Sequence, residues 1–359
     1  MAATGYDPFR RGRFAAGART VEVPDPARGR AYTCEIWYPA DPGRPGPHGQ
    51  PAGLEGDRDA VPVPGQHPLI VYSHHSGGHR RKATFLGRHL ASHGYVVAAP
   101  DHTEVVAADL APGDGATGAE RAAWVETVVT SRVPDVRLVL DYLLAGGAAG
   151  SGPGGGATGI GLDGDRVGLA GHSLGGWTVL AVPDSEPRVR AVVAMGPGGS
   201  SRPVPGVLRL SLDFAWQREV PVLYLAAEND VPIPLDGVAE LFGRTPEPKR
   251  MFVLERADHQ HFVDDVEEEH EALRALPLPG DAAWMTAAMR PASELCPGEQ
   301  AHAFTRGLAL AHFDAALRQQ AAAEQFLASG AEAALAAHGV AAFAYPPTAT
   351  APARDTAIR

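Results

Sequence analysis

Short apolar runs alternate with stretches of helical spacing through the middle of the chain, and this alternation predicts its fold. "HPLIVYSH" at 67–74 is an apolar run that stops at polar residues, and "YVVAAPDH" at 95–102 is a second one. Between them, "RKATFLGRHLASHG" at 81–94 places apolar residues at helical spacing. Strand, helix and strand in this order form a parallel pair joined by a right-handed crossover. The pattern therefore predicts an α/β protein with a mostly parallel sheet.

The same alternation continues toward the C-terminus. An amphipathic stretch at 132–145 predicts a helix that covers the sheet, and the spacing at 303–327 predicts one long helix. Further apolar runs predict the remaining strands, at 166–171, 189–195, 220–227 and 249–255. We expect these strands to lie in one sheet with the first two.

Both ends of the chain depart from the alternation. Residues 19–38 hold two β-rich stretches around a "DPARGR" turn, which predicts an antiparallel hairpin at the sheet edge. Proline and glycine dominate 39–68, which predicts a long connecting loop. We therefore expect a single domain over residues 1–330, and the Ala/Pro/Thr composition of 331–359 predicts a flexible tail.

The segment "RVGLAGHSLGGWTVL" at 166–180 places a serine between two glycines, directly after a predicted strand and before a helix-compatible run. Gly171, Ser173 and Gly175 form a G-x-S-x-G pattern, the sequence of a nucleophile elbow. The glycines lack side chains, so the strand and the helix can approach each other closely around the serine. Ser173 is therefore the candidate nucleophile.

A serine hydroxyl needs a base, and the base needs an acid that orients it. In this kind of site the acid and then the histidine follow the serine along the chain. Asp230 and His259 each follow a predicted strand in that order, and both would point toward the elbow. Asp213 and Asp236 are alternative acids, and His261 is the alternative base.

The negative charge that develops during attack needs two backbone N–H donors, the oxyanion hole. One donor should come from Leu174, immediately after the nucleophile. The other should come from the glycine-containing loop "SHHSGGH" at 73–79, where Ser76 is the expected donor.

Several of these segments resemble one known family. "GHSLGG", "LIVYSHHSGG", "LASHGYVVAAPDH" and "ADHQHF" resemble α/β-hydrolases of the platelet-activating-factor acetylhydrolase type and the related bacterial proteins called predicted dienelactone hydrolases. The openings "YDPFRRGRF" and "RGRAYTCEIWYP" are similar to the bacterial relatives, so the resemblance covers about residues 6–330. It implies an α/β-hydrolase fold with helices on both faces of the sheet, and a serine esterase activity.

The chain departs from this family at three places. The acetylhydrolases usually show S-H-G where this chain has Ser73, His74 and His75, which makes the mouth of the site bulkier and more polar. They can also place the acid after the preceding strand, but that strand ends here in "AMGPGG", which favours Asp230. True dienelactone hydrolases use a cysteine nucleophile, so Ser173 argues against that reaction.

Composition narrows the classes of partner and location. The 359-residue chain has a formal net charge of −11 and no Lys/Arg block, so a nucleic-acid partner is not expected. No stretch approaches the ~20 apolar residues of a membrane span, and the N-terminus lacks the apolar core of a signal peptide. Cys34 and Cys296 are too few for a disulfide framework. These features predict a soluble, cytoplasmic protein.

Histidines gather in "SHHSGGH" and in "DHQHFVDD" at 258–265, which raises the question of a metal site. The H-E-x-x-H and H-x-H-x-D-H spacings that would favour one are absent. No metal and no other cofactor is expected.

Residues 267–298, between the candidate base and the last predicted helix, are acidic at first and then apolar, with Trp284, Met285 and Met289. Two interpretations stay open: a surface excursion, or a lid that lines an apolar acyl or alcohol pocket.

The candidate residues together predict a serine-dependent hydrolase of small carboxylic esters that works through an acyl-enzyme. Cleavage of an amide, or transfer of the acyl group, would use the same triad. A non-catalytic ligand-binding relative is a further alternative, which an intact triad disfavours. The bulky His75 beside the site predicts short acyl groups of roughly two to six carbons, since the gain per buried methylene ends at the pocket floor.

Overall fold

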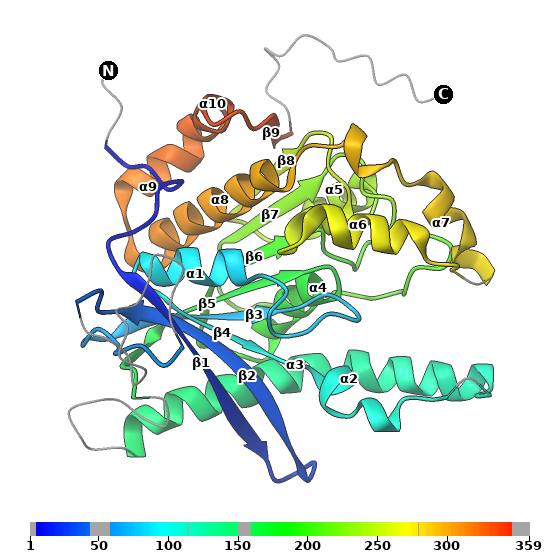
Figure 1. The fold of residues 1–359 in the computed structure, drawn as a ribbon, viewed down its shortest axis with the longest axis horizontal. Coiled ribbons are helices and arrows are strands. Elements are labelled where there is room, and N and C mark those ends of the chain that lie inside the picture. Colours follow the sequence, from blue (N-terminus) through cyan, green and yellow to red (C-terminus); the bar gives the residue numbers. More distant parts are fainter. Residues whose placement is uncertain (1–4, 44–57, 114, 150–158, 279, 347–359) are drawn as a thin grey trace.

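A mixed sheet runs through the part of the chain that the computed structural model describes, residues 5–43, 58–113, 115–149, 159–278 and 280–346 (Figure 1). In these residues it has nine strands in the order β1-β2-β4-β3-β5-β6-β7-β8-β9. The strand bounds are β1 Ala15–Asp25, β2 Arg30–Ala40, β3 His67–Ser73, β4 Val96–Pro100, β5 Leu162–His172, β6 Val189–Met195, β7 Val222–Ala227, β8 Lys249–Leu254 and β9 Ala342–Tyr345.

The central strands of this sheet are parallel. Adjacent strands are parallel from β4 through β3, β5, β6 and β7 to β8. The pairs β1–β2, β2–β4 and β8–β9 are antiparallel. Strands of a parallel sheet are covered on both faces, so their side chains are buried on both sides and their sequences are continuously apolar. β3 and β4 are accordingly buried along their whole length. The predicted mostly parallel sheet and its N-terminal hairpin are confirmed.

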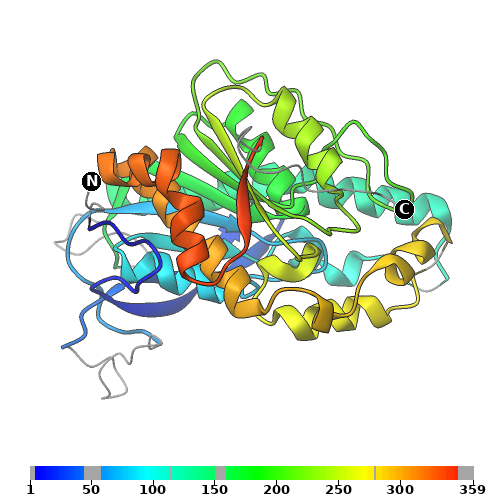
Figure 2. The same ribbon diagram turned by 90° about the horizontal axis from the view of Figure 1, so that it is seen from above.

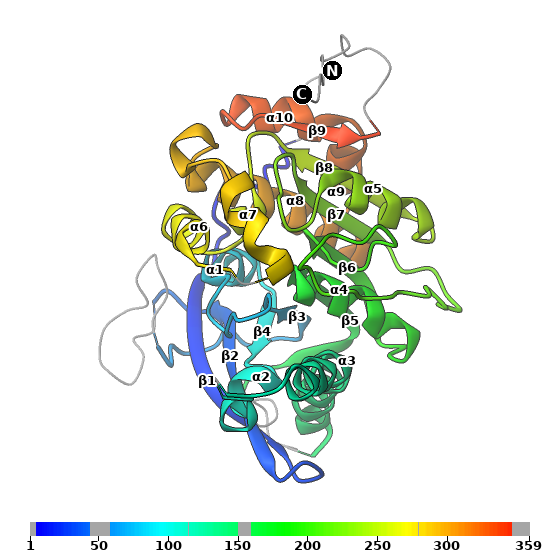
Figure 3. The same ribbon diagram turned by 90° about the vertical axis from the view of Figure 1, so that its right-hand side faces the viewer.

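Helices cover both faces of the sheet. Ile70 packs on the side of α1 and α8, whereas its neighbours Leu69 and Val71 pack on the side of α3, α4 and α5, as the two-residue period of a strand requires. Figure 3 shows α1 and α4 on opposite sides of the strands. The helix bounds are α1 Thr84–Ser92, α2 Thr103–Val106, α3 Gly118–Ala149, α4 Leu174–Ala181, α5 Leu235–Arg244, α6 Val266–Ala275, α7 Ala283–Ala288, α8 Gly298–Arg318, α9 Ala321–Gln325 and α10 Ala331–Ala337.

The C-terminal region differs from its prediction in two ways. The expected single helix over 303–327 is broken, because Gln319 adopts a left-handed conformation (φ 54°, ψ 36°) that ends α8 before α9 begins. Residues 331–345, expected to be flexible, form α10 and β9 (red in Figure 2). Leu335 of α10 is fully buried, and β9 pairs with β8, which would otherwise be an edge strand. The rest of the predicted tail, from 347 on, lies outside the described residues.

Residues 44–57 of the long proline- and glycine-rich loop also lie outside the described residues. Its C-terminal part returns to the sheet through isolated bridges, Ala18 to Arg58 and Ala40 to Pro62. No helix in the described parts of the chain is long and apolar enough to cross a membrane.

Candidate active site

Ser173 occupies a sharp turn between β5 and α4. Its backbone has φ 59° and ψ −117°, a region that residues with a side chain rarely adopt, and its N–H donates to the carbonyl of Met195 at 2.9 Å. The turn lies at the carboxyl end of a central parallel strand, where neighbouring strand ends converge. A strained serine at this position is the geometry that the G-x-S-x-G pattern predicts.

The two glycines of the pattern are required by close packing. A Cβ at Gly171 would lie 2.2 Å from the carbonyl oxygen of Gly175, and a Cβ at Gly175 would lie 2.0 Å from the carbonyl oxygen of Ser73. Neither backbone could move without separating α4 from the sheet. The predicted reason for these glycines therefore agrees with the structure.

The structure brings Ser173, His259 and Asp230 into one chain of hydrogen bonds. His259 begins a short 3₁₀ turn, His259–Phe262, after β8, and its Nε2 lies 2.8 Å from Oγ of Ser173. Its Nδ1 lies 2.8 Å from Oδ2 of Asp230, which follows β7. Since the carboxylate accepts from Nδ1–H, Nε2 is left to accept the serine proton. Asp230 and His259 are both buried, and the N–H of Ile233 donates to the other Asp230 oxygen at 2.7 Å.

The alternative residues lie outside this chain of hydrogen bonds. Asp213 and Asp236 are exposed, and Asp236 forms an ion pair with Arg202 at 2.7 Å. His261 is buried elsewhere, with Nδ1 3.0 Å from the N–H of Asp258 and Nε2 3.2 Å from the carbonyl of Cys296.

The electrostatic surroundings single out His259 among the histidines that pack together here. Burial lowers the pKa of His259, but the Asp230 carboxylate and the nearby Asp258 outweigh this and raise it above its ordinary value. Burial lowers the pKa of His75 to about 4, and that of His172 well below its usual range. The ring of His172 packs 4.6 Å from that of His259, so His259 lies against a neutral aromatic side chain. Burial raises the pKa of Asp230, and the ion pair with His259 opposes that rise.

A cavity of about 350 Å³ opens at Ser173 and His259. Both expected oxyanion donors, Ser76 and Leu174, line it. Leu174 is the first residue of α4, and Ser76 lies in the loop after β3, so the two approach the serine from different elements.

Two apolar segments form the walls of this cavity. The first is the possible lid, residues 267–298, which contributes Leu273, Leu278, Met285 and Met289. Trp284, expected beside the methionines, is instead 40% exposed and donates its indole N–H to the carbonyl of Pro205 at 3.1 Å.

The second wall is the loop after β6, which contributes Val207, Leu208 and Leu210. Sequence reasoning missed this loop because it has no periodicity and no recognisable motif. Its only sequence signal is a group of apolar residues within a stretch that is otherwise rich in proline and glycine.

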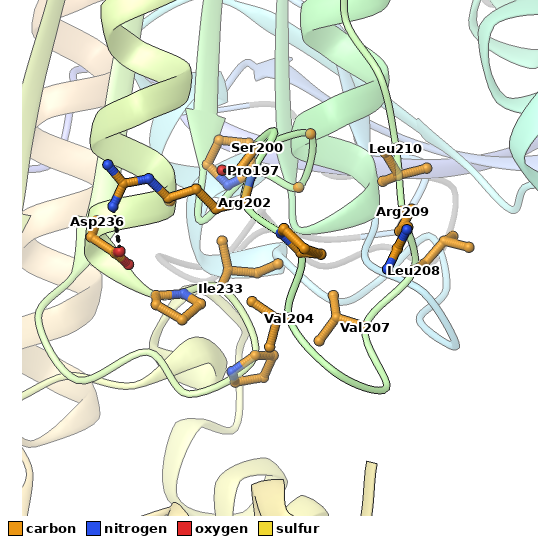
Figure 4. Close-up of a pocket in the computed structure, with 16 residues that line it drawn as sticks. Pro197, Ser200, Arg202, Val204, Val207, Leu208, Arg209, Leu210, Ile233 and Asp236 are labelled. Carbon is orange, nitrogen blue, oxygen red and sulfur yellow. Dashed lines mark hydrogen bonds and ion pairs between the residues drawn. The ribbon is translucent and has the colours of Figure 1, made fainter. Parts of the chain in front are cut away.

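A second cavity of about 260 Å³ adjoins the first and shares with it several lining residues, including Val207, Leu208 and Ile233 (Figure 4). Figure 4 shows Arg202, paired with Asp236, at one side of this cavity and Arg209 at the other. Neither arginine lines the cavity at Ser173, so both belong to the adjoining cavity alone.

Other candidate chemistry is limited in the part of the chain that the structure describes. Cys34 and Cys296 are buried free thiols. No group of three or more His, Cys, Asp or Glu side chains among the described residues is arranged to hold a metal ion.

Comparisons with known proteins agree with this architecture. The family model for platelet-activating factor acetylhydrolase, isoform II, matches residues 57–123, which include β3, the Ser76 loop, α1 and β4. The platelet-activating factor acetylhydrolase of Cavia porcellus is 23% identical over 230 residues, 55% of this chain and 49% of that protein. The resemblance to the platelet-activating-factor acetylhydrolases is confirmed. The chain spans about half the length of that curated relative.

A solved structure resembles the chain over most of its length. The ferulic acid esterase from Streptomyces cinnamoneus is 25% identical, with a TM-score of 0.58, and the match covers 89% of this chain and 93% of that one. Together with the sheet order and the strand-turn-helix at Ser173, this match identifies the fold as that of the α/β-hydrolases.

Proposed function

We propose that the protein is a serine hydrolase that cleaves small carboxylic esters through an acyl-enzyme. The observation that carries the proposal is the unbroken chain of hydrogen bonds from Ser173 through His259 to Asp230, at the mouth of an apolar cavity. The similarity to acetylhydrolases and to an esterase supports the same reaction class.

The geometry supports the following mechanism. Oγ of Ser173 attacks the ester carbonyl carbon while Nε2 of His259 takes its proton, and Asp230 stabilises the imidazolium that forms. The carbonyl oxygen becomes an oxyanion, to which the N–H groups of Leu174 and Ser76 donate. The imidazolium gives its proton to the leaving alcohol as the tetrahedral intermediate collapses to the acyl-enzyme. Water then attacks the acyl-enzyme, with His259 again as the base, and the acid is released.

The same residues would serve amide cleavage or transfer of the acyl group to another acceptor. Turnover of matched ester and anilide substrates separates these reactions. A non-catalytic role is disfavoured, because such proteins usually lack one member of the triad.

We also propose that residues 267–298 act as a lid and that the protein is cytoplasmic. Four apolar side chains of that segment in the cavity wall support the first proposal, and the two free buried cysteines support the second.

We predict a rise of kcat/KM with pH, because His259 must start neutral in order to accept the serine proton. The surrounding carboxylates raise the pKa of His259, so the midpoint should lie above the ~6.5 of an ordinary histidine. Hydrolysis of a short nitrophenyl ester, followed across the neutral range, measures it. Asp258→Asn should move the midpoint down, and Asp163→Asn, which alters a distant carboxylate paired with Arg166, should not. A midpoint well below that of free histidine would contradict the assigned base.

We also predict that short acyl esters, roughly two to six carbons long, are the best substrates. An apolar pocket gains about 0.8 kcal/mol per buried methylene until its floor is reached. His75 lines the cavity and packs its ring 5.4 Å from that of His172, so a bulky polar side chain closes this side. The measurement is kcat/KM for acetyl, butyryl, octanoyl and palmitoyl nitrophenyl esters. A maximum at octanoyl or beyond would mean that the pocket continues past His75.

A further inference from the structure

Arg132, on α3, is fully buried although it carries a positive charge. A buried guanidinium is costly unless its donors find acceptors. Its Nη1 donates to the carbonyl of His74 at 2.7 Å and to Oγ of Ser73 at 3.3 Å. Its Nη2 donates to the carbonyl of His75 at 3.4 Å and to the carboxylate of Glu104. Three of these four acceptors belong to the loop that carries Ser76.

Other donors hold the carbonyls of this loop in the same way. Nε2 of His74 accepts from the N–H of His102 at 3.2 Å, so its proton lies on Nδ1, which donates to the carbonyl of His75 at 2.7 Å. Nδ1 of His75 lies 2.8 Å from the carbonyl of Ser76. The carbonyl of His75 thus accepts from both Arg132 and His74, and the N–H of Gly78 approaches it at 3.1 Å.

A second contact ties the loop to the same helix. Because Arg132 donates to Oγ of Ser73, the hydroxyl proton of Ser73 is free to bond to Nε2 of His102, 2.8 Å away. Nδ1 of His102 then donates to Asp135 at 3.2 Å. Ser73, His102 and Asp135 repeat the residue types of a catalytic triad, but all three are fully buried, so here they fasten the end of β3 to α3.

The planarity of the peptide bond connects these contacts to Ser76. In a trans peptide the C=O and the N–H point in opposite directions, and the carbonyl of His75 shares its peptide with the N–H of Ser76. Arg132 approaches this carbonyl from α3, so a carbonyl held toward Arg132 turns the Ser76 N–H away from α3. Ser76 lines the cavity at Ser173, which puts its backbone beside the place where the oxyanion would form.

We propose that Arg132 is a positioning residue for the oxyanion hole: it holds the His75–Ser76 peptide so that the Ser76 N–H donates to the transition state. The proposal rests on the proposed function. Arg132 is itself buried and does not line the cavity at Ser173. Its loss should therefore weaken the stabilisation of the oxyanion in the transition state and leave binding of the substrate in the ground state unchanged.

The test compares Arg132→Gln with Arg137→Gln. Arg137 lies on the same helix, is 48% exposed, and pairs with Glu186 at 3.8 Å. For a short nitrophenyl ester, the kcat of Arg132→Gln should fall by up to the ~100-fold that loss of one oxyanion donor costs, with KM nearly unchanged. Affinity for a trifluoromethyl ketone, which forms a tetrahedral adduct with Ser173, should fall in parallel with kcat/KM. Arg137→Gln should match the wild type in each measurement.

Arg132→Lys keeps a cation in the site but has all its N–H donors on one nitrogen, so it should show the same pattern with a smaller loss. It decides the question if the glutamine variant does not fold. A folded variant with normal kcat, a loss confined to KM, or a trifluoromethyl ketone that still binds normally would overturn the proposal. Failure of both variants to fold would also overturn it, because Arg132 would then be a folding residue. If the wild-type protein hydrolyses no ester, the proposed function itself has failed.

Discussion

Ser173→Ala should abolish ester hydrolysis. Loss of the nucleophile from an intact triad costs on the order of a millionfold in turnover, because no covalent intermediate can form and the oxyanion hole alone retains only weak catalysis. The measurement is kcat for acetyl or butyryl nitrophenyl ester. Labelling by a fluorophosphonate, located by peptide mass spectrometry, should occur at Ser173 in the wild type and disappear in the variant.

The matched control is Ser329→Ala. Ser329 is an exposed serine whose hydroxyl, among the described residues, bonds to Gln325 four positions earlier. It should keep both turnover and labelling. Retention of a tenth of wild-type turnover in Ser173→Ala would rule out this serine as the nucleophile.

The residues at the strand ends could be predicted from sequence because each depends on local rules. Ser173 was found from its flanking glycines, and Asp230 and His259 from their positions after apolar runs. Strand ends of a parallel sheet meet at one edge, so three local observations were enough to predict one constellation. The structure joins the three side chains by hydrogen bonds of 2.8 Å, and their catalytic roles stay a prediction.

The network behind the oxyanion loop could not be predicted in this way. Arg132 contacts residues almost 60 positions earlier in the chain, and nothing in its own neighbourhood indicates burial. The amphipathic spacing predicted a helix over 132–145 only, and a proline is ordinarily unfavourable inside a helix because it lacks the N–H of a helical hydrogen bond. The observed α3 begins at Gly118 and continues through Pro134. Tertiary contacts around Arg132 and Asp135 outweigh that local preference.

The apolar walls of the cavity show the same limit. Met285 and Met289 were predicted because they stand out in an otherwise unpatterned segment, whereas Leu208 and Leu210 were not. The indole of Trp284 bonds to Pro205 and lies outside the cavity. Which apolar side chains of a loop face a cavity depends on backbone turns that composition does not record.

Asp230→Asn should be the most damaging change to a residue that does not itself react with substrate. An amide in place of the carboxylate keeps the shape of the side chain, but its NH₂ group can donate to Nδ1 of His259. This favours the tautomer with the proton on Nε2, which cannot accept the serine proton. The neutral amide also fails to stabilise the imidazolium. In a well-studied triad this change costs about ten-thousandfold in kcat.

Asp236→Asn and Asp213→Asn provide matched controls, since both carboxylates are exposed and neither contacts His259. They should lower turnover little. In Asp230→Asn, the residual activity should still rise with pH, but the midpoint of this rise should lie at a lower pH than in the wild type. The reason is that the carboxylate that raises the pKa of His259 is gone. A severe loss in Asp213→Asn, with Asp230→Asn close to wild type, would mean that the acid of the triad comes from the loop after β6. The 2.8 Å contact between Asp230 and His259 would then be structural, and His259 would need a different partner during the reaction.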